Sequence, residues 1–228
     1  MPKILKVKSK DEAQIRFKHI KSPLLKPPFI GVINGSVRSG KSNILINMIY
    51  NDEFYKDSFD KIIFISPTVN NDITLKHLSE DEDVLKIDSD LENLDDILRT
   101  IVETKEKDEE ELNKYYLIVM DDCLGFIKQR SYVSFLCTRY RHYKLSLIFT
   151  TQNFRSIPNI IRQNATFYLI FRTTNKKEEA KYCDEFSSIF DKWEELYEIG
   201  TKEPYSFLYL DLRNCCAYKN FEKEISSK

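Results

Sequence analysis

One stretch near the start of the chain has the residue types and the spacing needed to hold a chain of phosphates. Residues 35–42 read "GSVRSGKS", which fits the pattern G-x-x-x-x-G-K-[ST]. In such a loop backbone N–H groups converge on phosphate, and the helix that follows adds the positive end of its dipole. Lys41 would reach the β- and γ-phosphates, and Ser42 would be a ligand of Mg²⁺. The predicted nucleotide-binding residues are Gly35, Ser36, Val37, Arg38, Ser39, Gly40, Lys41 and Ser42.

An acid pair supplies the second kind of chemistry. The stretch "LIVMDD" places Asp121 and Asp122 directly after four apolar residues, about 80 residues beyond the loop. The first acid is predicted to lie on the metal side of the site, and the second to orient or deprotonate an attacking water. Glutamate is commoner in the second role, and two acids that merely end a strand are the alternative interpretation.

A glutamine and two arginines extend this chemistry. "IFTTQ" ends an apolar run with Gln152, whose amide could contact the γ-phosphate or its attacking water. "CTRYRHYK", just before that run, carries Arg139, Arg141 and His142. An arginine that enters a neighbouring subunit's site can neutralise charge in the transition state of phosphoryl transfer. These residues therefore favour a ring or another oligomer.

Two short motifs allow a different nucleotide. "DCLG" at residues 122–125 fits the D-x-x-G of GTPases, and "NKKE" at residues 175–178 comes near their guanine-reading N-K-x-D. In this second motif Glu178 stands where GTPases have aspartate, and both motifs are short enough to arise by chance. A regulatory GTPase or nucleotide-switched binding module is thus the alternative to an ATPase.

The chemistry requires elements that bring these residues together. Apolar runs alternate with amphipathic stretches, which predicts a mostly parallel, doubly wound α/β sheet flanked by helices. A C-terminal β-hairpin is expected from residues 205–221, with its turn at Arg213 and Asn214. The predicted strands are residues 29–33, 61–65, 115–120, 145–150 and 166–171, and the predicted helices are residues 42–51, 91–106, 132–143, 158–163 and 176–190.

Length, charge and cysteine usage set the context. The 228 residues suffice for one domain, divided here into a basic arm (1–28), a P-loop domain (29–221) and a tail (222–228). Residues 79–114 hold 15 acidic and 5 basic residues, so we expect an outward-facing helix followed by a mobile "KEKDEEE" segment. Five cysteines without a CxxC pair and no long apolar run predict a soluble, intracellular protein without a membrane-spanning segment.

The motifs together resemble those of a known family. "GSVRSGKS", "LIVMDD", "RYRHYKLSLIFTTQ" and "IPNIIRQNA" are similar to the motifs of the genome-packaging ATPases of nucleocytoplasmic large DNA viruses, the poxvirus-type branch of the FtsK/HerA superfamily. The resemblance covers residues 27–172 and implies a RecA/FtsK-like P-loop NTPase fold. It also implies that Gln152 is the glutamine at the end of the strand after the acidic motif.

The same resemblance implies function and partners. It implies an arginine finger near the start of that strand, for which Arg141 is the first choice and Arg139 the second. It implies an ATP- and Mg²⁺-dependent motor that moves double-stranded DNA into a preformed capsid, acting as a ring-shaped oligomer that docks on capsid or portal vertex proteins. The expected location is the virus factory in the host cytoplasm, and the virion as a second place.

Overall fold

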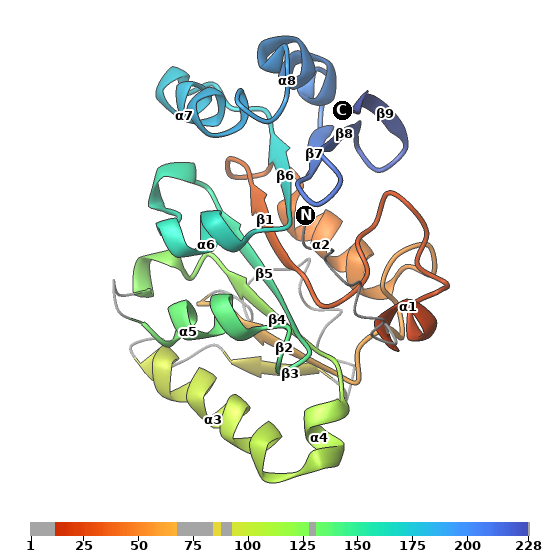
Figure 1. Ribbon diagram of the computed structural model, residues 1–228. Helices are drawn as coiled ribbons and strands as arrows, with labels where there is room; N and C mark the ends of the chain where they lie inside the picture. Colours follow the sequence, from red (N-terminus) through yellow and green to blue (C-terminus); the bar gives the residue numbers. More distant parts are fainter. Residues whose placement is uncertain (1–11, 68–83, 88–92, 128–130, 228) are drawn as a thin grey trace, which may run out of the picture.

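The computed structural model describes residues 12–67, 84–87, 93–127 and 131–227 of the chain (Figure 1). Within this part nine strands pair in one sheet, in the order β3-β2-β4-β5-β1-β6-β7-β8-β9. The first six strands in this order, from β3 to β6 and including β1 and β2, run parallel to one another. Strands β7, β8 and β9 follow β6 at one side of the sheet and pair antiparallel. The strands are β1 (Ile30–Asn34), β2 (Lys61–Ile65), β3 (Val84–Ile87), β4 (Tyr116–Asp121), β5 (Leu145–Thr151), β6 (Phe167–Phe171), β7 (Phe207–Asp211), β8 (Cys216–Lys219) and β9 (Lys223–Ser227).

The predicted α/β class and the predicted hairpin are confirmed. All five predicted strands are present, and β7 and β8 form the C-terminal hairpin. Its turn is held by Asp211, whose carboxylate accepts hydrogen bonds from the backbone N–H groups of Arg213 and Asn214 at 2.9 and 3.0 Å. Strands β3 and β9 were not predicted: β3 (VLKI) is only four residues long in a strongly acidic stretch, and β9 (KEISS) has one apolar residue.

Helices join the parallel strands and cover the sheet. The α-helices are α1 (Glu12–Arg16), α2 (Lys41–Tyr50), α3 (Leu94–Lys107), α4 (Glu109–Asn113), α5 (Tyr132–Arg139), α6 (Asn159–Asn164), α7 (Lys176–Phe186) and α8 (Trp193–Thr201), with short 3₁₀ turns η3 (Leu124–Phe126) and η4 (Phe154–Ser156). No helix in the described part of the chain is long and apolar enough to cross a membrane.

The prediction of a mobile "KEKDEEE" segment is wrong. This stretch ends α3 and forms α4, whose first turn is capped by the Asp108 side chain accepting from the N–H of Glu110. Lys105 is completely buried and donates from Nζ to the carbonyl oxygens of Glu111 and Lys114, at 2.7 and 2.8 Å. A buried ammonium that satisfies two carbonyls fixes the segment, and charge counting does not reveal this.

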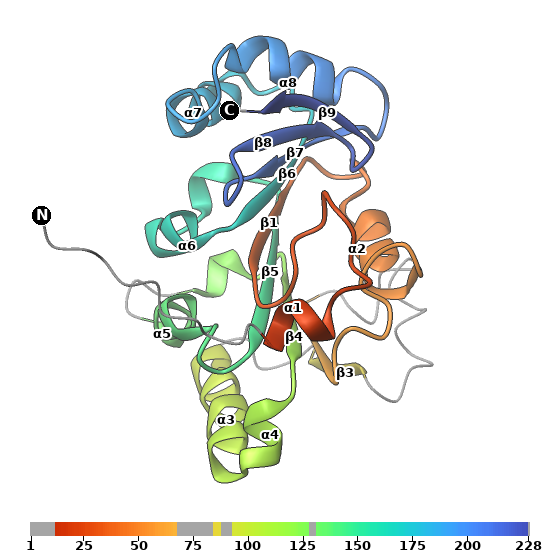
Figure 2. The same cartoon turned by 45° about the vertical axis from the view of Figure 1, so that its right-hand side comes forward.

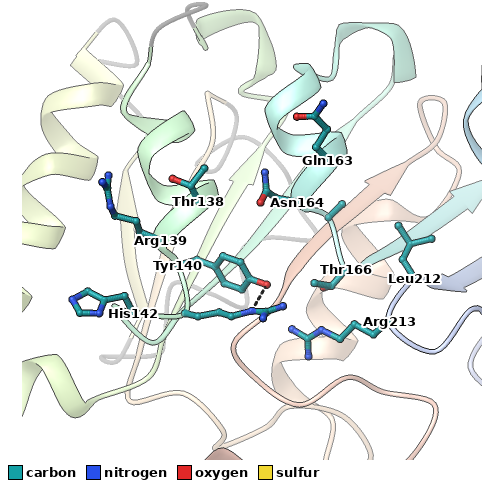
Figure 3. Close-up of a pocket in the computed structure, with 11 residues that line it drawn as sticks. Thr138, Arg139, Tyr140, His142, Gln163, Asn164, Thr166, Leu212 and Arg213 are labelled. Atoms are coloured by element: carbon teal, nitrogen blue, oxygen red, sulfur yellow. Dashed lines mark hydrogen bonds between the residues drawn. The ribbon is translucent and has the colours of Figure 1, made fainter. Parts of the chain in front are cut away.

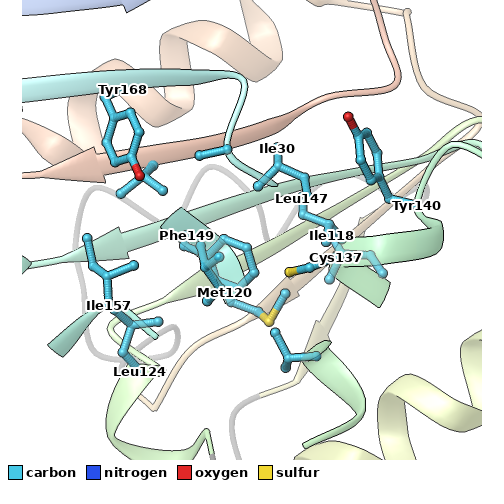
Figure 4. Close-up of a cluster of buried hydrophobic side chains, with 14 of the residues drawn as sticks. Ile30, Ile118, Met120, Leu124, Cys137, Tyr140, Leu147, Phe149, Ile157 and Tyr168 are labelled. Carbon is cyan, nitrogen blue, oxygen red and sulfur yellow. The ribbon is translucent and has the colours of Figure 1, made fainter. Parts of the chain in front are cut away.

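The sheet is buried on both faces, as Figure 2 shows: α5 and α6 lie on one side, and α2 on the other. Alternate strand residues point into two apolar clusters, so Val32 packs with the α3, α5 and α6 side and Ile33 with the α2 side. Figure 4 shows part of the first cluster, where Met120, Leu147 and Phe149 from β4 and β5 meet Cys137 of α5. This two-sided packing holds the strand ends, and thus the loops on them, in fixed positions.

Both ends of the described chain pack onto the domain. Phe17 is fully buried with its ring 4.8 Å from that of Tyr115, and the Tyr55 hydroxyl donates to the carbonyl oxygen of Leu25 at 2.8 Å. Strand β9 lies within the predicted tail and pairs with β8. The division into arm, domain and tail stays a prediction, and residues 1–11 of the arm lie outside the described residues.

Candidate active site

The phosphate-binding loop connects β1 to α2 and is anchored at both ends. The N–H of Gly35 donates to the carbonyl oxygen of Thr151 on β5 at 3.1 Å, and the buried Asn34 amide donates to the same oxygen at 3.3 Å. Tyr182 of α7 in turn donates its hydroxyl to the Asn34 side chain. Gly40 caps α2 with φ of 107°, a conformation that residues with a Cβ adopt only with strain. The loop therefore has the context that phosphate binding requires.

Lys41 points into its own loop. Only 8% of its surface is exposed, and Nζ donates to the carbonyl oxygens of Gly35 at 2.8 Å and Ser36 at 3.0 Å. Burial lowers the pKa of Lys41, while the carboxylates of Asp122 and Asp121 act in the opposite direction. The ammonium thus lies between the loop and the acid pair, where it can meet terminal phosphates.

Asp121 is a buried carboxylate held by two hydroxyls. Thr150 donates to its Oδ1 at 2.5 Å, and Ser66 donates to its Oδ2 at 3.0 Å. Burial raises the pKa of Asp121, because desolvation disfavours the charged carboxylate; Asp122 adds to this rise, while the two hydroxyls and Lys41 act in the opposite direction. A bound divalent cation would offset that cost, so Asp121 at the end of β4 and Ser42 in the first turn of α2 fit the metal-side roles predicted for them.

Asp122 and Gln152 come together at the end of the sheet. The Gln152 side-chain amide donates to Asp122 Oδ2 at 2.9 Å, although the two residues are 30 positions apart. The backbone N–H of Asp122 donates to Thr150 Oγ1 at 3.1 Å, and Asp122 has a left-handed φ of 50°. The acid predicted to activate water and the glutamine predicted to sense phosphate thus share one hydrogen bond.

The loop after Gln152 is fixed by α7. Glu178 is 7% exposed and accepts a hydrogen bond from the N–H of Phe154 at 2.8 Å, and its other oxygen lies 3.7 Å from Arg155 Nε. Asn175 caps α7 by accepting from the N–H of Lys177. Because Asn175 and Glu178 have these structural partners, "NKKE" has a role as a helix start, and these contacts argue against the guanine-reading interpretation.

Arg139 and Arg141 lie at the edge of the sheet where the parallel strands begin, opposite the edge that carries the phosphate-binding loop. They precede β5, while Gln152 follows it, and a seven-residue strand spans about 20 Å. Arg139 lies over the ring of Phe135 at 4.3 Å, and Arg141 donates from Nε to the Tyr140 hydroxyl at 2.9 Å. Neither arginine can therefore serve the site of its own chain.

A cavity of about 580 Å³ opens at this opposite edge (Figure 3). Arg139, Arg141 and His142 line it from the β5 side, and Arg213 lines it from the β7–β8 turn; none of the described residues that line it is acidic. Arg213 is held by donating to the carbonyl oxygens of Lys26 and Pro28, at 3.4 and 2.6 Å. In Figure 3 Arg139 and His142 point away from Arg213, and the dashed line marks the Arg141–Tyr140 bond. The cavity is suited to an anion.

Sequence reasoning missed four residues that the structure brings to these sites. Thr150 and Ser66 hold Asp121, and each directly ends or follows a buried strand, so their position next to "LIVMDD" in the sheet was the available signal. Glu178 and Arg213 were noted in the sequence only as a motif residue and a turn residue, because each reaches its place through a contact with a distant segment.

Comparisons with known proteins decide the family. The family model described as Poxvirus A32 protein matches residues 15–189. This chain belongs to that family. The resemblance drawn from the motifs is confirmed, and this Poxvirus A32 family member is a genome-packaging ATPase. That the loop, the two acids and Gln152 form its active site stays a prediction. A search of curated proteins finds no match.

Solved structures agree with the fold of this family member. The genome packaging NTPase B204 from Sulfolobus turreted icosahedral virus 2 in complex with AMP is 19% identical, with a TM-score of 0.64, over 90% of this chain and 100% of that chain. The same protein in complex with ATP-gammaS is 18% identical, with a TM-score of 0.61, over 85% and 96%. The pCW3 conjugation coupling protein TcpA with ATPgS is 16% identical, with a TM-score of 0.54, over 84% and 64%. At these identities the likeness shows the fold alone.

Proposed function

We propose that this protein hydrolyses ATP to drive double-stranded viral DNA into a preformed capsid. The observation that carries the proposal is the hydrogen bond between Gln152 and Asp122 beside a complete phosphate-binding loop, in a chain of the Poxvirus A32 family. The fold likeness to B204, a genome packaging NTPase solved with ATP-gammaS, supports it.

The hydrolytic step follows from the positions of the side chains. Backbone N–H groups of residues 35–42 would hold the phosphates, and Lys41 would leave the carbonyl oxygens of Gly35 and Ser36 to meet the β- and γ-phosphates. Ser42 and Asp121 would hold Mg²⁺, which would supply neutralisation of the phosphate charge. Asp122 would accept the proton of the attacking water.

Gln152 is positioned to report hydrolysis. Its amide bonds to Asp122 in this structure, and the same amide could turn to the γ-phosphate when nucleotide is bound. Because Glu178 ties the next residues to α7, a change at Gln152 would be transmitted to α7 through η4. This chain of contacts is a route from the phosphate to the outer helices.

The arginine finger would be supplied by a neighbouring subunit. Arg141 lies about 20 Å from the carboxyl edge of its own sheet, so it would act on the next protomer's γ-phosphate, with Arg139 as the second candidate. A ring-shaped homo-oligomer provides such contacts. Arg141, beside His142, stays the first choice; both arginines have contacts within the chain, Arg141 with Tyr140 and Arg139 with Phe135.

The partners follow from this activity. Double-stranded DNA would pass through the ring, and capsid or portal vertex proteins would hold the ring on the particle. The motor would work in virus factories of the host cytoplasm and could be carried in the virion. The basic segment at residues 1–28, with 8 Lys/Arg and 2 Asp/Glu, is a candidate for one of these contacts.

The decisive experiment measures ATP hydrolysis with and without double-stranded DNA, together with the mass of the protein in solution. We expect DNA to raise the rate and the mass to correspond to an oligomer, while Lys41→Ala abolishes turnover in both conditions. A monomer whose ATPase rate ignores DNA would contradict the motor. A clear preference for GTP over ATP would contradict it independently.

A further inference from the structure

A second cavity, of about 350 Å³, lies directly beside the phosphate-binding loop. One wall is the outer part of that loop, residues 36–39, and the opposite wall is the connection from α8 to β7, residues 201–206. Phe171 and Arg172, at the end of β6, line it between these walls. The cavity is thus continuous with the place where phosphates bind.

The strand order decides which part of a nucleotide would reach this cavity. Asp121 and Asp122 follow β4 and Gln152 follows β5, both on one side of β1 in the sheet. Strands β6 and β7 lie on the other side of β1, and the cavity is built on their ends. With its terminal phosphate at the acids, a nucleotide would extend its sugar and base across the loop toward β6 and β7.

One side chain in the cavity has the properties of a base-binding surface. Tyr205 is 74% exposed, and Val37 in the facing wall is 67% exposed; both are among the few large apolar residues that the described chain leaves in solvent. The Tyr205 ring lies beside the loop, since a Cβ added to Gly40 would be 3.6 Å from Tyr205 Cδ1. An exposed tyrosine ring at the rim of a ligand site offers a flat face on which a nucleotide base can stack.

The backbone holds Tyr205 in place at a cost. Its φ is 63°, the left-handed region that a bulky aromatic residue adopts rarely and with strain. The turn is fixed because Ser206 donates from its N–H and its hydroxyl to the carbonyl oxygen of Glu203, at 3.1 and 2.8 Å. A strained backbone that presents an aromatic ring to solvent beside a phosphate loop needs an explanation beyond packing.

We propose that this cavity receives the nucleoside of ATP and that Tyr205 stacks on the adenine ring. The inference rests on the nucleotide site of the proposed function and adds the residue that holds the base. Stacking on an aromatic ring contributes about ten- to hundredfold to affinity and tolerates any base. Tyr205 therefore sets the affinity for ATP, and the choice between ATP and GTP lies elsewhere.

A third cavity borders Tyr205 on its other side and is the alternative location for the base. It is lined by residues 21–24, by Ile44 of α2 and by Phe54, Phe207 and Phe221, with no residue of 36–39 among its described lining. A base there would be separated from the outer part of the phosphate loop by the tyrosine. The cavity that has the phosphate-binding loop as one wall is therefore the better site for the base.

The test compares Tyr205→Asn with Tyr205→Phe. Asparagine tolerates the left-handed backbone and removes the ring, while phenylalanine keeps the ring. Equilibrium binding of ATP and of inorganic tripolyphosphate, which has no base, is measured for each protein. We expect Tyr205→Asn to weaken ATP binding about ten- to hundredfold and to leave tripolyphosphate binding unchanged, while Tyr205→Phe resembles the parent.

Three outcomes would overturn the inference. Unchanged ATP affinity in Tyr205→Asn would show that the ring does not contact the base. An equal loss for ATP and tripolyphosphate would show that the ring only supports the loop. A larger loss of ATP affinity in Phe54→Leu, on the third cavity, would place the base there. Because binding needs neither turnover nor DNA, these results are independent of whether the protein proves to be a DNA motor.

Discussion

The sheet has two edges formed by strand ends, one where the parallel strands finish (the carboxyl edge) and one where they begin (the opposite edge). These two edges differ in the charged side chains that they carry. The carboxyl edge carries Asp121 and Asp122, with one buried lysine held by its own loop. The opposite edge carries Arg141 and Arg213 around a cavity whose described lining contains no acid. A terminal phosphate with its metal ion would meet the two carboxylates and the Lys41 ammonium at the first edge, while Arg38 of the loop and Arg172 after β6 line the neighbouring cavity.

This difference is the reason for proposing that one chain supplies half of an active site. Arg141 precedes β5 and Gln152 follows it, so the two residues lie at opposite ends of that strand, about 20 Å apart. Stacking one subunit's arginine edge on the next subunit's acidic edge would pair opposite charges. The comparison therefore predicts contact in trans, and four changes test it from the largest effect to the smallest.

Replacing the arginine at the basic edge should have the largest effect. Arg141→Ala is expected to lower DNA-stimulated ATP turnover by about 10³- to 10⁵-fold while ATP binding persists, because transition-state charge is left without its partner. Mixing this variant into the parent protein should remove more activity than its share of subunits. Activity that falls only in proportion to mutant content would contradict action in trans, and Arg139→Ala is the matched control with the smaller expected loss.

Replacing the second acid at the opposite edge tests the hydrolytic role. Asp122→Asn keeps an acceptor for the Gln152 amide but cannot take a proton, so turnover should fall about 10²- to 10⁴-fold. Single-turnover hydrolysis and ATP binding, measured together, separate this loss from weak binding. If hydrolysis stays within the range of the parent, Asp122 is a structural residue and another group activates the water.

Removing the Thr150 hydroxyl, which contacts both acids, should have an intermediate effect on turnover. Thr150→Val removes the donor to Asp121 Oδ1 and the acceptor for the N–H of Asp122, so turnover should fall about tenfold. Thr150→Ser keeps the hydroxyl and should retain most of the rate. An equal loss in both variants would mean that the methyl group, and therefore packing, matters at this position.

The smallest effect concerns stability and its dependence on pH. Because the pKa of Asp121 is raised in the folded protein, the folded state binds its proton more tightly than the unfolded state, and this group destabilises the fold as pH rises above its ordinary range. Asp121→Asn should therefore melt a few degrees higher than the parent at pH 7 without nucleotide, with a smaller difference at pH 4. Thermal unfolding at both pH values checks the sign, and a lower melting temperature at pH 7 would contradict it.

The sheet could be predicted because its strands are continuous apolar runs, and a parallel sheet buried on both faces requires such runs. The helix after the loop was predicted for a related reason, since its start is part of the phosphate motif. The prediction was incomplete where segments have weak patterns: α8 was missed, and the predicted helix at residues 176–190 ends at Phe186. It was wrong at "KEKDEEE", where the buried Lys105 fixes a segment that charge counting marks as mobile.

Sequence alone determined the residue types of the nucleotide site, because a phosphate loop and the acids after a strand are short patterns read along the chain. Tertiary structure decided which of these residues are in contact. It brought Glu178 of α7 into hydrogen-bonding distance of Phe154 in η4, and it placed Tyr205 beside Gly40. Those contacts depend on the order in which strands pair, which brings loops distant in the chain to one edge of the sheet. Arg141 precedes β5 and therefore lies at the end of that strand away from the phosphate-binding loop, and for that reason we expect another subunit to complete the site.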